Sequence, residues 1–123
     1  MNKSEKHILI VDDEEINTSL FGKMIRHLGY SVTVTVDSLN ALRLFTENPY
    51  KFDLILADQT MPNLTGAELC EKVKQIRPEI PVIIITGTAN MDFTILRDAG
   101  VKEVILKPVR LNSLKESLEK HLE

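Results

Sequence analysis

Short, solid runs of apolar residues, each ending in a polar or charged residue, limit the possible folds of this chain most strongly. The run LILA over residues 54–57 stops at Asp58, and similar runs cover residues 7–11 and 82–85, while a shorter apolar strand over residues 104–106 ends at Lys107 and is expected at a sheet edge. Runs of this length and composition are typical of strands buried on both faces, as in parallel sheets that are covered by helices. The chain is therefore expected to contain a parallel sheet with a polar edge.

Segments with helical spacing alternate with these runs. Ser38 and Thr65 are predicted N-caps of two of the helices, and Gly29 is a predicted left-handed residue after the first helix. Each helix is expected to pack against the sheet through its apolar positions, which are Ile16, Leu20, Met24 and Leu28; Leu39, Leu42 and Phe45; Leu69, Val73 and Ile76; Phe93, Leu96 and Ala99; and Leu111, Leu114, Leu118 and Leu122.

The segment SVTVTV over residues 31–36 differs from the solid runs because valines alternate with polar residues. Such alternation suits a half-exposed strand at the edge of a sheet. Five strands alternating with five helices predict an α/β fold, a flavodoxin-like (βα)5 three-layer sandwich, and right-handed crossovers favour the strand order 2-1-3-4-5. We expect one domain over residues 1–123, with a core of about residues 6–121.

Composition excludes several classes of protein. Of the 123 residues, 43% are hydrophobic and 27% are charged, which is globular, and no apolar stretch is long enough to span a membrane. The amino end carries no export signal, so a cytoplasmic location is expected. The net charge of −3 with scattered basic residues argues against direct nucleic-acid binding. The single cysteine, Cys70, lies among helically spaced apolar residues and is expected to be a buried structural thiol.

Polar side chains with complementary chemistry follow the strands. The carboxyl ends of parallel strands share one edge of the sheet, so Asp12 and Asp13 are expected beside Asp58, with Thr86 and Lys107 on the same rim. Three crowded carboxylates repel one another unless a cation lies between them, which indicates a divalent cation, and an all-oxygen ligand set favours Mg²⁺. A carboxylate, a metal, an ammonium and a hydroxyl around one point suit phosphoryl transfer, with Asp58 as the nucleophile that forms an acyl phosphate.

Four stretches, taken together and in this order, carry a family resemblance: ILIVDDEE, LILADQTMPNLTG, VIIITGT and VILKPV. In these stretches the chain resembles the response-regulator receiver domain of two-component signalling, and DQTMP is similar to receivers attached to hybrid histidine kinases. The resemblance implies that Asp58 is the phosphoacceptor, that Asp12 and Asp13 hold Mg²⁺, and that the backbone carbonyl of Thr60 is a further ligand.

The resemblance also implies roles for the other rim residues and for partners. Thr86 and Lys107 would bind the phosphoryl oxygens, and the Lys107–Pro108 peptide bond is expected to be cis. The phosphoryl donor would be a histidine kinase or a histidine phosphotransfer protein. An output partner would be regulated through the surface around residues 88–110, and the domain would act as a signalling module rather than as an enzyme on other substrates.

The chain departs from the family pattern at two places. Thr65 and Gly66 stand where many receivers have Asp-Gly, and Val104 stands where the family often places a Tyr or Phe that swings inward on phosphorylation. The usual aromatic switch is therefore not expected here. The last helix also lacks the charge pattern of receivers that dimerise through that face to bind DNA.

Three alternatives share parts of this pattern. A Mg²⁺-dependent phosphohydrolase of the haloacid-dehalogenase type needs a D-x-D signature, whereas Glu14 occupies its third place. A flavodoxin-like flavin binder needs a hydroxyl-rich phosphate loop, and here that loop is acidic. A pseudo-receiver would keep the fold for protein contacts alone, although every residue for phosphoryl chemistry is present.

Overall fold

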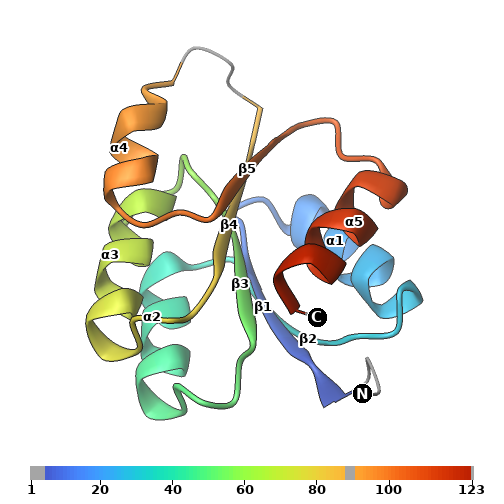
Figure 1. The fold of residues 1–123 in the computed structure, drawn as a ribbon, viewed down its shortest axis with the longest axis horizontal. Coiled ribbons are helices and arrows are strands. Elements are labelled where there is room, and N and C mark those ends of the chain that lie inside the picture. The colour runs from blue at the N-terminus through green and yellow to red at the C-terminus, as the bar shows by residue number, and fades with distance from the viewer. Residues whose placement is uncertain (1–4, 88–90, 123) are drawn as a thin grey trace.

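The computed structural model describes residues 5–87 and 91–122 and contains one five-stranded parallel sheet (Figure 1). The sheet order β2-β1-β3-β4-β5 confirms the predicted order. The strands are β1 (His7–Val11), β2 (Ser31–Thr35), β3 (Leu54–Asp58), β4 (Val82–Thr86) and β5 (Glu103–Leu106). The helices are α1 (Glu15–His27), α2 (Ser38–Glu47), α3 (Gly66–Ile76), α4 (Phe93–Asp98) and α5 (Leu111–Leu122).

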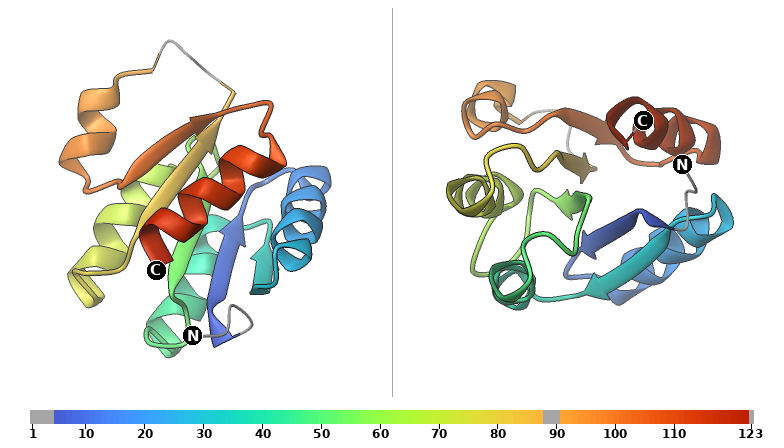
Figure 2. Two further views of the ribbon diagram at one scale, coloured as in Figure 1. Left: turned by 45° about the vertical axis from the view of Figure 1, so that its right-hand side comes forward. Right: turned by 60° about the horizontal axis from the view of Figure 1, so that its bottom comes forward.

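The helices form two layers on opposite faces of the sheet. Helices α1 and α5 lie on one face, and α2, α3 and α4 lie on the other, as Figures 1 and 2 show. Phe21 and Leu118 pack in the cluster under α1 and α5, whereas Phe45 and Val73 pack in the cluster under α2, α3 and α4. Neighbouring residues of a strand point to opposite faces, so both clusters draw on the solid apolar runs. All five residues of β3 and of β4 are buried.

The ends of the helices follow the sequence signals in part. Thr65 caps α3 through a capping box with Glu68, and Gly29 has a φ of 102°, as predicted. The cap predicted at Ser38 is wrong. Asp37 caps α2 by accepting a hydrogen bond from the backbone N–H of Leu39 at 3.0 Å, and the Ser38 hydroxyl points elsewhere.

The buried faces of several helices also differ from the expected ones. Ile16 and Leu20 of α1 are 75% and 53% exposed, whereas Phe21 and Ile25 are buried. A four-residue step overshoots one helical turn by about 40°, so a row of four such residues winds about 120° around the helix, from solvent toward the core. The remaining predicted core positions that are exposed are Leu39, Ile76, Phe93 and Leu111.

Cys70 is buried, as predicted, and its Sγ donates to the backbone oxygen of Ala99 at 3.3 Å. Burial raises the pKa of the Cys70 thiol to about 11, although Lys74 opposes this shift. A thiol that stays protonated at neutral pH is a poor nucleophile. Among the described helices, none has both the length and the apolar character needed to cross a membrane.

Candidate functional site

The carboxyl ends of β1 and β3 bring two aspartates together. Val11 and Ala57 pair in the parallel register, so Asp12 and Asp58 follow at adjacent positions of neighbouring strands. Asp58 is the last residue of β3 and pairs in turn with Ile85 of β4. The solid apolar strands therefore place these carboxylates on the edge of the sheet, as the sequence predicts.

Three carboxylates form a compact cluster at this edge. One oxygen from each of Asp12, Asp13 and Asp58 lies within 4.8 Å of the other two. Asp12 is 2% exposed and Asp58 8% exposed, whereas Asp13 is exposed to solvent. The Oδ1 atom of Asp12 accepts a hydrogen bond from the backbone N–H of Glu14 at 2.9 Å, which fixes the start of the loop after β1.

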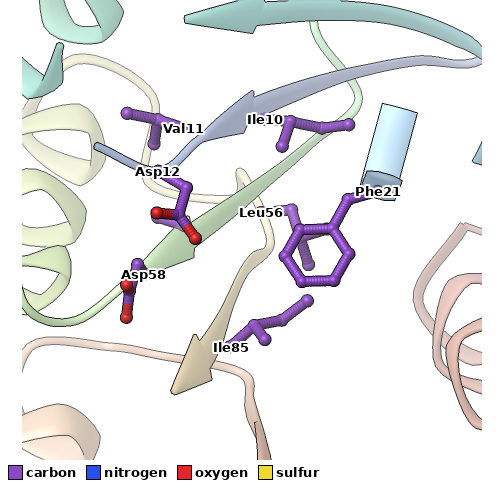
Figure 3. A pocket seen from close by; sticks show the side chains of 8 residues that line it. Ile10, Val11, Asp12, Phe21, Leu56, Asp58 and Ile85 are labelled. Carbon is purple, nitrogen blue, oxygen red and sulfur yellow. The ribbon is translucent and has the colours of Figure 1, made fainter. Parts of the chain in front are cut away.

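Apolar side chains lie behind two of these carboxylates. Figure 3 shows Phe21, Leu56 and Ile85 on the inner side of Asp12 and Asp58. An apolar lining excludes water from one side of the carboxylates and so makes their negative charge harder to solvate. The cluster is thus open to solvent on its outer side, where Asp13 lies.

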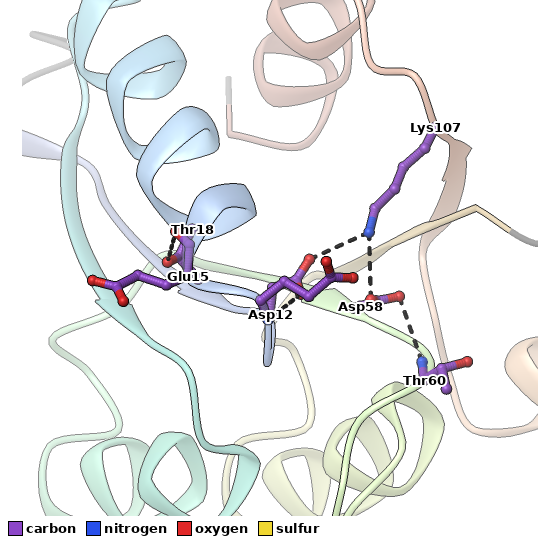
Figure 4. Close-up of polar contacts among 7 residues, drawn as sticks. Asp12, Glu15, Thr18, Asp58, Thr60 and Lys107 are labelled. Carbon is purple, nitrogen blue, oxygen red and sulfur yellow. Dashed lines mark hydrogen bonds and ion pairs between the residues drawn. The ribbon is translucent and has the colours of Figure 1, made fainter.

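Lys107 places its ammonium between the two buried carboxylates. Its Nζ lies 3.3 Å from Oδ2 of Asp12 and 3.4 Å from Oδ2 of Asp58 (Figure 4). The backbone N–H of Lys107 donates to the carbonyl of Thr86 at 2.8 Å, which ties the end of β5 to the end of β4. The Lys107–Pro108 peptide bond is cis, as predicted.

Burial and neighbouring charges shift the pKa values of Asp58 and Lys107. Burial raises the pKa of the Asp58 carboxyl above its ordinary value; Lys107 opposes this effect, and the negative charge of Asp12 adds to it. Burial alone would lower the pKa of the Lys107 ammonium, but Asp58 and Asp12 together raise it. A neighbouring cation therefore lowers the free-energy cost of keeping Asp58 ionised, and Lys107 stays protonated.

The loop after β3 and the end of β4 supply the remaining predicted site residues. The backbone N–H of Thr60 donates to Oδ1 of Asp58 at 3.4 Å (Figure 4), so Thr60 lies next to the cluster. Thr86 is buried and lies one residue beyond Ile85, the partner of Asp58 in the sheet. The structure thus brings Thr60 and Thr86 to the same edge as the carboxylates. Thr88, which belongs to the predicted output surface, lies outside the described residues.

The donor set fits Mg²⁺. The three carboxylates and the single Lys107 ammonium leave two negative charges, and their oxygens are the hard ligands that Mg²⁺ prefers. The exposed position of Asp13 leaves room for the water ligands that Mg²⁺ usually keeps.

The sequence interpretation missed the residues that hold the loop after β3. The backbone carbonyl of Gln59 accepts from the N–H of Gly66 at 3.0 Å, and its side-chain oxygen accepts from the N–H of Ala67 at 2.9 Å. The Ser38 hydroxyl reaches the same loop from α2. A serine at the start of a helix has the sequence signature of a cap, and no sequence pattern assigns its hydroxyl to a distant loop.

Residues 8–119 match the family described as response regulator receiver domain. The chain is 36% identical over 113 residues to the Regulator of RpoS of Escherichia coli K12, covering 90% of this chain and 33% of that protein. It spans 18% of the length of another relative, the Saccharomyces cerevisiae transcription factor SKN7.

Solved structures agree with these sequence matches. A response regulator receiver domain protein from Clostridium thermocellum has a TM-score of 0.89 and 31% identity, covering 95% of this chain and 94% of that one. The receiver domain of the sensor histidine kinase PA1611 from Pseudomonas aeruginosa has a TM-score of 0.86 and 27% identity, covering 95% and 97%. That structure has a magnesium ion coordinated in its active-site cleft.

Proposed function

Because the chain belongs to the response regulator receiver domain family, we propose that Asp58 accepts a phosphoryl group from a histidine kinase or a histidine phosphotransfer protein. Receiver domains are signalling modules of two-component systems. The observation that supports this proposal most directly is the juxtaposition of Asp58 with Asp12, Asp13 and Lys107 at one edge of the sheet. This arrangement combines a nucleophile, a cation site and a fixed ammonium.

The transfer needs a carboxylate that can attack phosphorus. An oxygen of Asp58 forms the new P–O bond, and the P–N bond to the donor histidine breaks with its electron pair staying on the imidazole. Asp12, Asp13, Asp58 and the backbone carbonyl of Thr60 would hold Mg²⁺. When bound, Mg²⁺ neutralises the charge that develops on the phosphoryl oxygens.

Lys107 and Thr86 stabilise the product. The Lys107 ammonium already lies 3.4 Å from Asp58, so it needs only a small movement to contact a phosphoryl oxygen there. The Thr86 hydroxyl is a donor at the end of the adjacent strand, where it can bond a second oxygen. These contacts replace the present ion pairs of Lys107. They link phosphorylation of Asp58 to the ends of β4 and β5.

The phosphorylated state is proposed to act on an output partner through the surface around residues 88–110. Thr86 lies two residues before this segment and Lys107 lies within it, so their movement toward the phosphoryl group would be transmitted there first. Residues 88–90 of the segment lie outside the described residues.

Intact mass spectrometry tests the phosphoacceptor directly. The parent chain, incubated with acetyl phosphate and Mg²⁺, should gain the mass of one phosphoryl group, and chelating the Mg²⁺ should prevent this. Asp58→Asn keeps the shape of the side chain but removes the nucleophile, so it should gain none. Asp98→Asn, which changes an exposed carboxylate on α4, is the matched control and should label like the parent. Equal labelling of Asp58→Asn and the parent would show that the assignment is wrong.

A further inference from the structure

The Ser38 hydroxyl makes two hydrogen bonds to a loop far away in the sequence. Ser38 is the first residue of α2 and is 1% exposed. Its Oγ donates to the backbone carbonyl of Pro62 at 2.8 Å and accepts from the backbone N–H of Leu64 at 3.1 Å. The Leu64 N–H also donates to the Pro62 carbonyl at 2.9 Å, so Ser38 reinforces a turn that has its own backbone bond. Both partners belong to the loop that joins Asp58 to α3.

These two bonds lie on either side of a residue with unfavourable backbone geometry. Asn63, between Pro62 and Leu64, has a φ of 74°, in the left-handed region. A residue other than glycine pays about 1 kcal/mol or more for this conformation, and asparagine tolerates it better than most. The Ser38 hydroxyl therefore adds to the backbone bond between Leu64 and Pro62 in stabilising the turn around Asn63.

The rest of the loop is held at its two ends. At one end the N–H of Thr60 donates to Asp58, and Gln59 accepts from the N–H groups of Gly66 and Ala67 at the other end. Ser38 adds a contact to the middle, from a helix that does not belong to the loop. Fixing the middle restricts how far the peptide of Thr60 can rotate away from the cluster.

The residues on either side of Ser38 are themselves hydrogen-bonded. Asp37 caps α2 through the N–H of Leu39, and the side chain of Asn40 donates to Oγ1 of Thr35 at 3.0 Å. The carbonyl of Thr35 accepts from the backbone N–H of Asp12 at 3.3 Å. The junction between β2 and α2 therefore contacts both the loop that carries Asp12 and the loop that follows Asp58.

We propose that Ser38 is a positioning residue for the phosphoacceptor site, which keeps the Thr60 carbonyl and Asp58 in the geometry that binds Mg²⁺. The inference rests on the proposed function of Asp58. It assigns a role to a side chain that touches neither the cation nor the phosphoryl group. Its effect passes through the backbone of residues 60–64.

Magnesium binding by the intact chain, followed through backbone amide signals, tests this inference. Ser38→Ala removes both hydrogen bonds and should raise the Mg²⁺ dissociation constant by about tenfold, as is typical when a group that orients a metal ligand is lost. The Leu64 amide should also exchange faster with solvent. Phosphorylation by acetyl phosphate at a fixed, subsaturating Mg²⁺ concentration should slow by a similar factor, and saturating Mg²⁺ should restore most of the rate.

Ser117→Ala is the matched control. Ser117 is also buried, but its hydroxyl donates to Glu103 at 2.6 Å, away from the loop. This variant should lose stability without changing the Mg²⁺ dissociation constant, so a general loss of stability cannot imitate the predicted effect. If Ser38→Ala does not fold, Ser38→Cys fills nearly the same space with a much weaker donor and takes its place.

The outcomes separate the two proposals. If the parent takes up a phosphoryl group on Asp58 but Ser38→Ala matches it within about twofold in Mg²⁺ affinity and rate, the role of Ser38 is refuted. If the parent takes up none, the proposed function fails, while Mg²⁺ affinity and Leu64 exchange still measure whether Ser38 positions the loop.

Discussion

The ammonium nitrogen of Lys107 lies 3.4 Å from the carboxylate oxygen Oδ2 of Asp58, although the two residues are 49 positions apart in the chain. The contact exists because β3 and β5 both border β4, so their carboxyl ends face the same edge. The ammonium lowers the electrostatic cost of the crowded carboxylates, but its positive charge also opposes the approach of a divalent cation. The same side chain thus stabilises the metal-free site and would compete with Mg²⁺ there.

Replacing Lys107 by methionine should separate these two effects. The metal-free protein should lose on the order of 1 kcal/mol of stability, because the carboxylates of Asp12 and Asp58 lose their counterion. Its affinity for Mg²⁺ should rise, because a nearby positive charge is gone. Thermal unfolding at a series of Mg²⁺ concentrations measures both quantities.

Lys115→Met removes an exposed lysine from α5 and serves as the control, with little change expected in either quantity. Weaker Mg²⁺ binding by Lys107→Met, with unchanged stability, would contradict the idea that Lys107 competes with the cation.

Asp58→Asn should make the protein more stable at neutral pH. The folded-state pKa of Asp58 lies above its ordinary value of 3.8, so the folded protein binds this proton more tightly than the unfolded chain does. The resulting stabilisation is complete below pH 3.8 and is lost as the pH rises through the folded-state pKa. Above that pH the charged carboxylate lowers the free energy of unfolding, and Asp58→Asn removes this destabilisation.

The stability difference between Asp58→Asn and the parent should therefore grow as the pH is raised from about 3 to 7. We expect a gain on the order of 1 kcal/mol at pH 7 without Mg²⁺, since the lost ion pair with Lys107 offsets part of the relief. Chemical denaturation at several pH values measures the difference. A gain that is larger at pH 3 than at pH 7 would mean that the pKa shift has the opposite sign.

Gly66→Ala should destabilise the fold and disturb the site together. A Cβ at Gly66 would lie 2.5 Å from Cδ1 of Ile84 and 2.6 Å from the backbone oxygen of Asp58, and a backbone atom cannot move aside cheaply. Overpacking of this kind costs about 1–3 kcal/mol. At Gly87 the nearest atom to an added Cβ is Cδ of Lys107 at 3.9 Å, so Gly87→Ala should be tolerated. Equal unfolding temperatures for the two variants would contradict this steric argument.

The topology and the carboxylate cluster could be predicted from the sequence because both depend on short-range patterns. Solid apolar runs identify the buried strands, and the residue after each run must lie at the edge of the sheet. This pattern predicts that Asp12, Asp58 and Lys107 lie together, and the structure confirms their proximity.

The finer contacts could not be predicted because they depend on tertiary geometry. The partners of Ser38 are backbone atoms 24 and 26 residues away, in a loop whose path no sequence pattern specifies. The exposure of Ile16 likewise depends on how α1 is rotated against the sheet. Its four-residue row suggested a buried stripe, but Phe21 and Ile25 face the core instead.

The response to phosphorylation is expected to be largest at the end of β4, because Val104 stands where the family often places an aromatic switch residue. Phosphorylation adds a charge of about −1.5 to −2 at Asp58, which should draw Lys107 and the Thr86 hydroxyl toward the phosphoryl oxygens. Gly87 follows Thr86 directly, and a glycine leaves the backbone free to adjust. Val104 of β5 is partly buried against the core cluster and has little volume that could swing between two positions.

In a beryllofluoride complex, beryllium with its fluorides stands in for the phosphoryl group. This complex should therefore shift the backbone amide signals of residues 86–90 most strongly. Residues 88–90 lie outside the described part of the chain. Val104 should keep its rotamer, which side-chain methyl signals report. Asp58→Asn mixed with beryllofluoride is the control and should show no such shifts. If the largest changes in amide signals instead fall on α1 and α2 while those of residues 86–90 do not shift, the proposed route through the end of β4 is wrong. Asp58 could still be the phosphoacceptor in that case.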